Sequence, residues 1–169
     1  HAVSSGSGTS LWNRLRTHRG ANSGTYKGGG NHRGSVFRKR VGEAMIERHG
    51  LHEEYPHWSE GSSAGRGRRL DELELERRVS GYIRDLPFLW VNVDDEPSAE
   101  SDRKYIERNA VALASNYQKE PIDQRCEDWL GNDSPRNDIS ESGLWNIDHV
   151  AEDYDPVFLD RLETAIEQT

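Results

Sequence analysis

Apolar residues recur at helical spacing in several stretches of the chain, with polar residues between them. In one stretch Phe37, Val41, Ala44 and Met45 stand at i, i+4, i+7 and i+8, which places all four on one helical face. The same spacing, with polar residues or proline at the starts, predicts five helices at about residues 10–18, 35–48, 70–85, 99–115 and 156–167.

One segment has the pattern of a strand. Residues 88–93 read Phe-Leu-Trp-Val-Asn-Val, a short apolar run that follows Pro87 and ends at acidic residues. Because the run is apolar on both sides, we expect a central strand. Residues 142–147 form a second apolar run that returns to the core. The expected fold class is therefore α+β, a small central antiparallel sheet flanked by several helices, with long polar loops.

Two long stretches show neither the helical nor the strand spacing of apolar residues. Residues 20–34 are rich in glycine, and residues 117–142 are polar. We interpret residues 117–142 as an insertion or a long surface loop. The length of 169 residues suits one domain, so residues 1–169 are expected to form a single unit.

Composition narrows the classes of protein that fit. Hydrophobic residues make up 33% of the chain and charged residues 31%, which indicates a small core under large polar loops. The single cysteine, Cys126, excludes an internal disulfide framework and a multi-cysteine zinc site, and it favours a reducing compartment. Since no run of about 18 apolar residues occurs, we expect no membrane span and a cytoplasmic protein of a bacterium or archaeon. A chain that begins at His1 without Met indicates a cut.

The formal net charge of −8 argues against a nucleic-acid partner until the chain is divided. Residues 1–48 hold nine Lys and Arg against two Asp and Glu, whereas residues 49–169 hold thirteen against twenty-eight. A phosphate backbone needs only one cationic face. The asymmetry fits either a nucleic-acid-binding face or a simply dipolar acidic protein.

The first predicted helix carries cations beside its apolar stripe. Leu11, Arg14, Leu15 and His18 stand at i, i+3, i+4 and i+7. Arg14 and His18 would then project at the rim of a cleft, where an Arg can bind a phosphate with two hydrogen bonds. The alternative is an Arg that extends to solvent beside a boundary His.

A later helix carries a carboxylate among small residues. Glu107 shares its face with Ala110, Val111 and Ala114. A carboxylate in such a place needs a cation, a hydrogen bond or a metal. Mg²⁺ is often bound by one carboxylate plus waters, and a Glu–Arg pair is the alternative.

Three segments carry a resemblance to a known family. Residues 8–20, GTSLWNRLRTHRG, resemble the segment after the second strand of the GIY-YIG nuclease superfamily, with Arg14 and His18 in its pattern. Residues 106–111, IERNAV, are similar to the helix around the metal-binding glutamate of that family, and residues 143–147, GLWNI, to its closing aromatic-Asn motif. The three occur in the family's order and span residues 9–147.

The resemblance implies a metal-dependent endonuclease that hydrolyses DNA phosphodiester bonds. Glu107 would bind Mg²⁺ or Mn²⁺, and Arg14 would bind the phosphoryl oxygens. His18 would relay or donate a proton or position a water, and Asn146 would orient a neighbouring group. The glycine-rich loop would let the backbone approach DNA closely. Six cationic residues are expected to contact DNA: Arg16, Arg19, Lys27, His32, Arg33 and Arg38.

The chain also departs from the family pattern. The two strands that give the family its name are expected just before His1, with residues 1–3 as the end of the second, so the catalytic tyrosine is not identified. The interval from Glu107 to Asn146 is longer than usual, which makes Asn116 a competing candidate. Residues 28–35 and the helix after them lie outside the minimal family core.

Other classes of function remain open. The scaffold could serve as a catalytically inactive nucleic-acid-binding or interaction module. An N-terminal His1 with His18 or His32 would suit a copper site, although the helical pattern and single cysteine disfavour it. The three histidines within residues 49–57 could form a zinc site, but a solvated loop is the preferred interpretation. Trp58 is the tryptophan placed to stack on a base, whereas the other four are core candidates.

Overall fold

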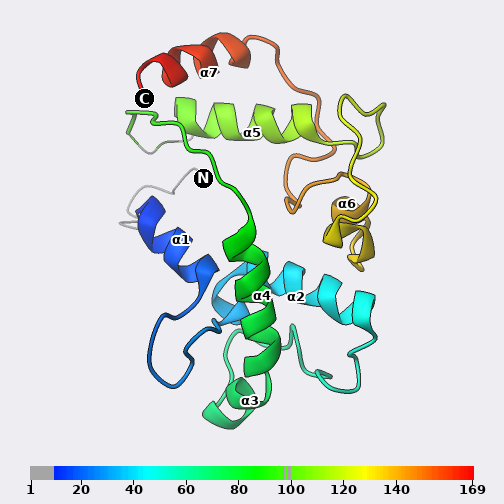
Figure 1. Cartoon of the computed structure of the whole chain (residues 1–169). Helices are drawn as coiled ribbons and strands as arrows, with labels where there is room; N and C mark the ends of the chain where they lie inside the picture. The colour runs from blue at the N-terminus through cyan, green and yellow to red at the C-terminus, as the bar shows by residue number, and fades with distance from the viewer. Residues whose placement is uncertain (1–9, 97, 99) are drawn as a thin grey trace.

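The computed structural model describes residues 10–96, 98 and 100–169 (Figure 1). These residues form seven α-helices and two 3-10 turns joined by long loops. In chain order the elements are α1 (Leu11–Arg19), η1 (His32–Gly34), α2 (Val36–His49), α3 (Arg66–Asp71), α4 (Leu73–Asp85), α5 (Asp102–Ala114), η2 (Leu130–Asp133), α6 (Asn137–Ser140) and α7 (Phe158–Glu167).

Serine caps set the starts of the three helices that matter most for the site. Ser10, Ser35 and Ser101 each accept a hydrogen bond from the backbone N–H three residues later, which begins α1, α2 and α5 respectively. Gly50 ends α2 in the left-handed conformation, with φ of 64°. The five helices predicted from the sequence are confirmed, with the third divided into α3 and α4.

The core lies between α2 and α4. The predicted apolar stripes of both helices face each other there, and α1 also packs on α4. The buried cluster consists of Val41, Ala44, Met45, Ile46, Tyr55, Trp58, Leu75, Val79, Ile83 and Leu130.

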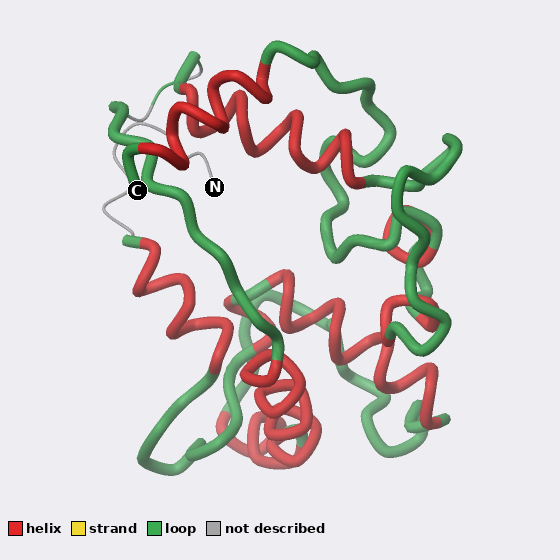
Figure 2. The backbone as a smooth tube through the Cα atoms, turned by 45° about the horizontal axis from the view of Figure 1, so that its top comes forward, coloured by secondary structure: helices red, strands yellow, loops and turns green. Residues whose placement is uncertain are grey.

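Helices α5 and α7 form a second packed pair, which Figures 1 and 2 show beside each other and apart from α1. Asn109 of α5 ties the pair to the loop before α7, because its Oδ1 accepts the backbone N–H of Asp155 at 2.7 Å. The hydroxyl of Tyr105 donates to the Asp155 carboxylate at 2.6 Å. The helix that carries Glu107 is thus held by the C-terminal part of the chain.

The expected central sheet is wrong for the described part of the chain, which contains helices and loops but no β-strand (Figure 2). Residues 88–93 link α4 to α5 without a strand partner. Leu89 is 98% exposed, and Phe88 and Trp90 are about half exposed. A strand exists through the ladder that it forms with a neighbour, and no described segment supplies one. The predicted strand end at residues 1–3 lies outside the described residues.

The polar stretch 117–142 contains more structure than a bare loop. It includes η2 and α6, both of which pack with α2 or with each other. Leu130 and Ile139 are buried, and Arg48 of α2 binds Asp133 at 2.6 Å. Among the described residues, no helix has the length and apolar character needed to cross a membrane.

Candidate functional site

His18 lies on the last turn of α1 and is held by the start of α2. Its Nδ1 lies 2.7 Å from Oγ of Ser35. Its ring packs edge-on against Phe37, with the ring centroids 5.5 Å apart. A guanidinium N–H of Arg38 donates to the His18 backbone carbonyl at 2.6 Å. Both the ring and the backbone of His18 are therefore fixed, although α1 itself buries none of its residues.

Arg14 lies one turn before His18 on α1. Burial lowers the pKa of His18, and the charges of Arg14 and Arg38 lower it further. The imidazole is therefore neutral at neutral pH. Nε of Arg14 is buried and has no hydrogen-bond partner, so the guanidinium keeps an unused donor. The structure brings Arg14 and His18 together as the sequence predicts, while their catalytic roles stay predictions.

A buried ion network supports this corner of the fold. Arg38 is fully buried, and it donates from Nε to a Glu76 oxygen at 3.0 Å and from Nη2 to the Ser80 hydroxyl at 3.0 Å. The other oxygen of Glu76 accepts the backbone N–H of His32 at 2.6 Å. Burial alone would raise the pKa of Glu76, but the hydrogen bond from His32 and the charge of Arg38 outweigh it and leave the pKa lowered. Glu76 is thus an ionised partner for two basic groups.

Three of the six cations expected to contact DNA are used inside the fold. His32 is buried and stacks on Trp58, with ring centroids 3.7 Å apart. Arg33 binds both oxygens of Glu72 at 2.5 and 2.7 Å, and its side chain is 1% exposed. Arg38 has no exposed surface. We therefore leave these three out of the candidate DNA-contacting surface. The other three are exposed: Arg16, Arg19 and Lys27.

The glycine-rich loop approaches protein instead of leaving its backbone free for a ligand. A Cβ added at Gly30 would lie 2.4 Å from the guanidinium carbon of Arg38, and one at Gly29 would lie 2.6 Å from the Leu73 side chain. The backbone of the loop therefore packs directly over the buried ion network and α4. The close approach that the glycines permit is used within the fold.

Asn146 is tied to the neighbourhood of His18 through the residue before it. Trp145 packs edge-on against Phe37 at 6.1 Å between ring centroids, and Phe37 packs against His18. Asn146 itself is exposed. The competing Asn116 follows α5 and has a buried Oδ1 without a hydrogen-bond partner. The aromatic contacts bring Trp145, the neighbour of Asn146, to this site, while the choice between the two asparagines stays a prediction.

Glu107 lies on a different pair of helices. It is half-buried on α5, which packs on α7, whereas Arg14 and His18 lie on α1, which packs on α4. A single carboxylate with waters is a donor set that suits Mg²⁺. The chemistry of Glu107 therefore fits the ion, but the main packing partner of its helix is α7, whereas that of the helix with Arg14 and His18 is α4.

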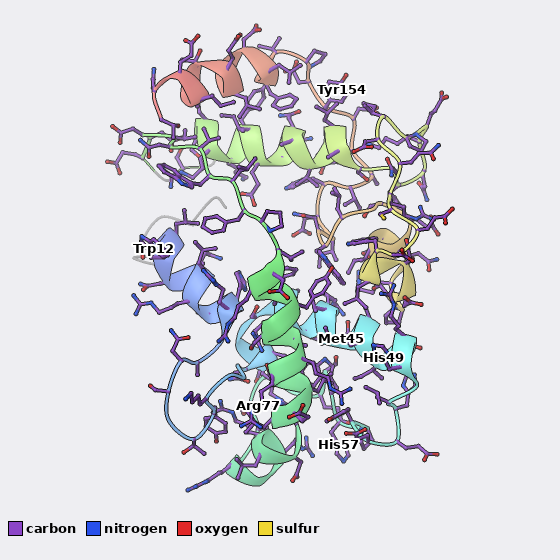
Figure 3. All side chains as sticks on the ribbon, viewed as in Figure 1. Trp12, Met45, His49, His57, Arg77 and Tyr154 are labelled. Carbon is purple, nitrogen blue, oxygen red and sulfur yellow. The ribbon has the colours of Figure 1, made fainter. Side chains whose placement is uncertain are left out.

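The other metal hypotheses find no cluster. Within residues 10–96, 98 and 100–169, no group of three or more His, Cys, Asp and Glu side chains could hold a metal ion. His52 lies 3.2 Å from Glu47, and His57 lies 3.0 Å from Glu60 (His57 is labelled in Figure 3). His1, the basis of the copper hypothesis, lies outside the described residues.

The burial of three tryptophans is the opposite of what the sequence predicted. Trp58, the predicted base-stacking residue, is 6% exposed, and its indole N–H donates to the Lys39 carbonyl at 3.1 Å, so that prediction is wrong. Trp12 and Trp90, expected in the core, are 66% and 56% exposed. Sequence reasoning also missed Ser35 and its contact with His18. The capping preference for serine at a helix start was the available signal for Ser35.

The comparisons with known proteins identify one family. A family model described as GIY-YIG domain matches residues 1–169. Neither the curated proteins nor the solved structures gave a match to the chain. The matched region contains α1 with Arg14 and His18, α5 with Glu107, and the segment with Asn146.

Proposed function

The chain belongs to the GIY-YIG family, and on this basis we propose that it is a metal-dependent endonuclease that hydrolyses DNA phosphodiester bonds. The family match over the whole chain is the observation that carries the proposal. The geometry around α1 supports it, because a helix that carries Arg14, Arg16 and Arg19 without an acidic residue, beside the neutral imidazole of His18, suits an anionic substrate.

Charge on α1 favours a phosphate backbone. The helix reads Leu-Trp-Asn-Arg-Leu-Arg-Thr-His-Arg and contains no acidic residue. Arg16 and Arg19 are exposed, as is Lys27 in the following loop. Phosphate contacts of this kind fix the position of a protein on DNA without reading its sequence.

Hydrolysis forms a bond from a water oxygen to phosphorus and breaks the bond from phosphorus to the leaving sugar oxygen. The attacking water loses a proton and the leaving oxygen gains one, so the step balances. Negative charge grows on the phosphoryl oxygens, and the guanidinium of Arg14 would bind them. Oγ of Ser35 accepts the Arg38 backbone N–H at 3.2 Å and lies 2.7 Å from Nδ1 of His18, to which it can donate its own proton. We assign that direction to the bond; the neutral ring then carries its proton on Nε2, which would donate to a water or a phosphoryl oxygen.

Glu107 would hold Mg²⁺ or Mn²⁺, and Asn146 would orient a neighbouring group or a substrate oxygen. When bound, the ion would supply Lewis-acid stabilisation of the charge on the leaving oxygen. The hard carboxylate oxygen of Glu107 fits this ion type.

The test is cleavage of supercoiled plasmid by the chain, with Mg²⁺, with Mn²⁺ and with chelator. We expect metal-dependent nicking that is lost in Glu107→Gln and Arg14→Gln and retained in the matched controls Glu120→Gln and Arg66→Gln, whose side chains are exposed. Mn²⁺ binding followed by electron paramagnetic resonance gives a second readout for Glu107. Metal-dependent cleavage that persists in Glu107→Gln would refute its assignment.

The separation of α5 from α1 favours one second candidate, a catalytically inactive DNA-binding module. It predicts DNA binding without cleavage under any metal condition. Loss of binding in Arg14→Gln with no effect of Glu107→Gln would support this second function.

A further inference from the structure

Trp12 stands exposed on a helix that has no buried residue. Two thirds of its surface, 66%, is accessible, although an indole is among the largest apolar side chains. Figure 3 shows it on α1, at the left edge of the molecule. A single exposed apolar side chain is ordinary on a protein surface, so the groups around Trp12 decide whether it belongs to a binding site.

Cationic side chains surround Trp12. A surface pocket of about 340 Å³ is lined by Trp12, Leu15, Arg16, Arg19, Gly20, Asn22 and Arg84, and no carboxylate is among these residues. Its volume lies within the range of roughly 300–1,000 Å³ found for small-molecule sites. The pocket therefore combines an aromatic face with three guanidinium groups.

The contacts of Arg84 indicate that the occupant of the pocket is an anion. Its Nε donates to the backbone carbonyl of Arg19 at 2.9 Å, which fixes the side chain against the end of α1. Its Nη2 is buried and has no hydrogen-bond partner. A buried guanidinium nitrogen without an acceptor is unusual in a folded protein, and a phosphate oxygen would satisfy it.

The pocket adjoins the site at His18. A neighbouring pocket of about 550 Å³ contains His18 and Phe37, and it shares Leu15, Arg19 and Arg84 with the first. A strand whose phosphate lies beside His18 would thus carry an adjacent nucleotide to Trp12.

We propose that this pocket binds an unpaired nucleotide, with the base stacked on Trp12 and the adjacent phosphate bound by Arg84. Both faces of a base within continuous duplex are covered by its neighbours, so only an unstacked base can lie on an indole. The preferred substrate is therefore DNA with a single-stranded or distorted segment. This inference rests on the proposed DNA-directed function and adds the class of DNA.

The test is metal-free binding of a fluorescent oligonucleotide, single-stranded or annealed to its complement, followed by anisotropy. Base–aromatic stacking contributes about 1–3 kcal/mol per base, so Trp12→Ala should weaken single-strand binding roughly 5- to 150-fold, with a much smaller effect on duplex. Trp12→Phe should retain most of the affinity. Trp90→Ala is the matched control, because Trp90 is 56% exposed and lies outside both pockets.

Arg84→Gln should weaken binding and reduce the slope of log affinity against log salt by about 1. Single-strand affinity that is unchanged in Trp12→Ala, or reduced equally in Trp90→Ala, would overturn the proposal. Displacement of the oligonucleotide by polyglutamate at equal charge concentration would also overturn it, in favour of an acidic protein partner. This binding assay needs no metal, so the two proposals can fail separately. A wild-type chain that does not cleave DNA under any metal condition would refute the endonuclease, whereas single-strand binding that depends on Trp12 would still support the nucleotide pocket.

Discussion

Replacing Arg38 by Met should destabilise the fold by about 3–5 kcal/mol at neutral pH, because the buried carboxylate of Glu76 loses its cation. The Glu76 side chain is 5% exposed and cannot be solvated without local opening. The variant also removes the bonds from the guanidinium to the carbonyl of Glu76 at 2.8 Å and to the carbonyl of His18 at 2.6 Å. Methionine fills much of the same volume, so loss of packing contributes little.

Urea denaturation followed by tryptophan fluorescence measures this loss. With an m-value of about 2 kcal/mol/M, a loss of about 4 kcal/mol lowers the midpoint by about 2 M. The matched control is Arg77→Met on the outer face of α4 (labelled in Figure 3), whose side chain is 48% exposed beside Glu74. Exposed ion pairs contribute about 0–1 kcal/mol. A midpoint for Arg38→Met no lower than that of Arg77→Met would refute the buried-charge reasoning.

The pH dependence sharpens the same prediction. The pKa of Glu76 is lowered from 4.5, so its stabilisation is fully present above about pH 4.5 and is lost as the pH falls through the lower folded pKa. In Arg38→Met the burial is opposed only by His32, and the pKa of Glu76 therefore rises. The free-energy difference between wild type and variant should shrink as the pH falls from neutrality toward about 4.5. A difference that is constant over this range would show that lost packing, not charge, causes the effect.

Three further substitutions test the site and its support. Gly42→Ala should lower the free energy of unfolding by about 1–3 kcal/mol, because the added Cβ would lie 2.2 Å from the indole ring of Trp58. Gly81→Ala, which has open space around the added Cβ, should not destabilise the fold. Equal urea midpoints for the two variants would contradict this reasoning. Arg14→Gln should raise the pKa of His18 toward 6.5, because it removes a cation that disfavours the imidazolium; titration of the ring protons by NMR measures it, and an unmoved midpoint would contradict it. Ser35→Thr should keep the Nε2–H form of His18, whereas Ser35→Asp, which only accepts, should favour Nδ1–H; long-range ¹H–¹⁵N correlation spectra distinguish the two, and an unchanged form in Ser35→Asp would refute the assigned hydrogen bond.

The helices could be predicted from sequence because their information is local. Apolar spacing and serine or glycine caps act within a few residues, and α1, α2, α4, α5 and α7 follow them closely. The prediction of a sheet was wrong, because a strand depends on a partner elsewhere in the chain and the local pattern does not show whether that partner exists. Residues 88–93 have strand composition, yet Leu89 lies 98% exposed in this fold.

The site was predictable only in its local part. Arg14 and His18 share a helix, so their spacing places them together. The Arg38–Glu76 pair joins positions 38 residues apart, and no periodicity signals it. For the same reason, the sequence did not show that Trp58 packs on α2 while Trp12 remains exposed.

The buried ion network links the stability of the fold to the geometry of the candidate site. Arg38 binds Glu76 on α4 and, through another nitrogen, the backbone carbonyl of His18 on α1. Its own backbone N–H binds Oγ of Ser35, which in turn contacts the His18 ring. One buried guanidinium thus fixes the end of α1 relative to both α2 and α4. Since α1 buries none of its own residues, these polar contacts, and not apolar burial, hold α1 in place. Weakening the network should therefore displace His18 at denaturant concentrations below those that unfold α2 and α4.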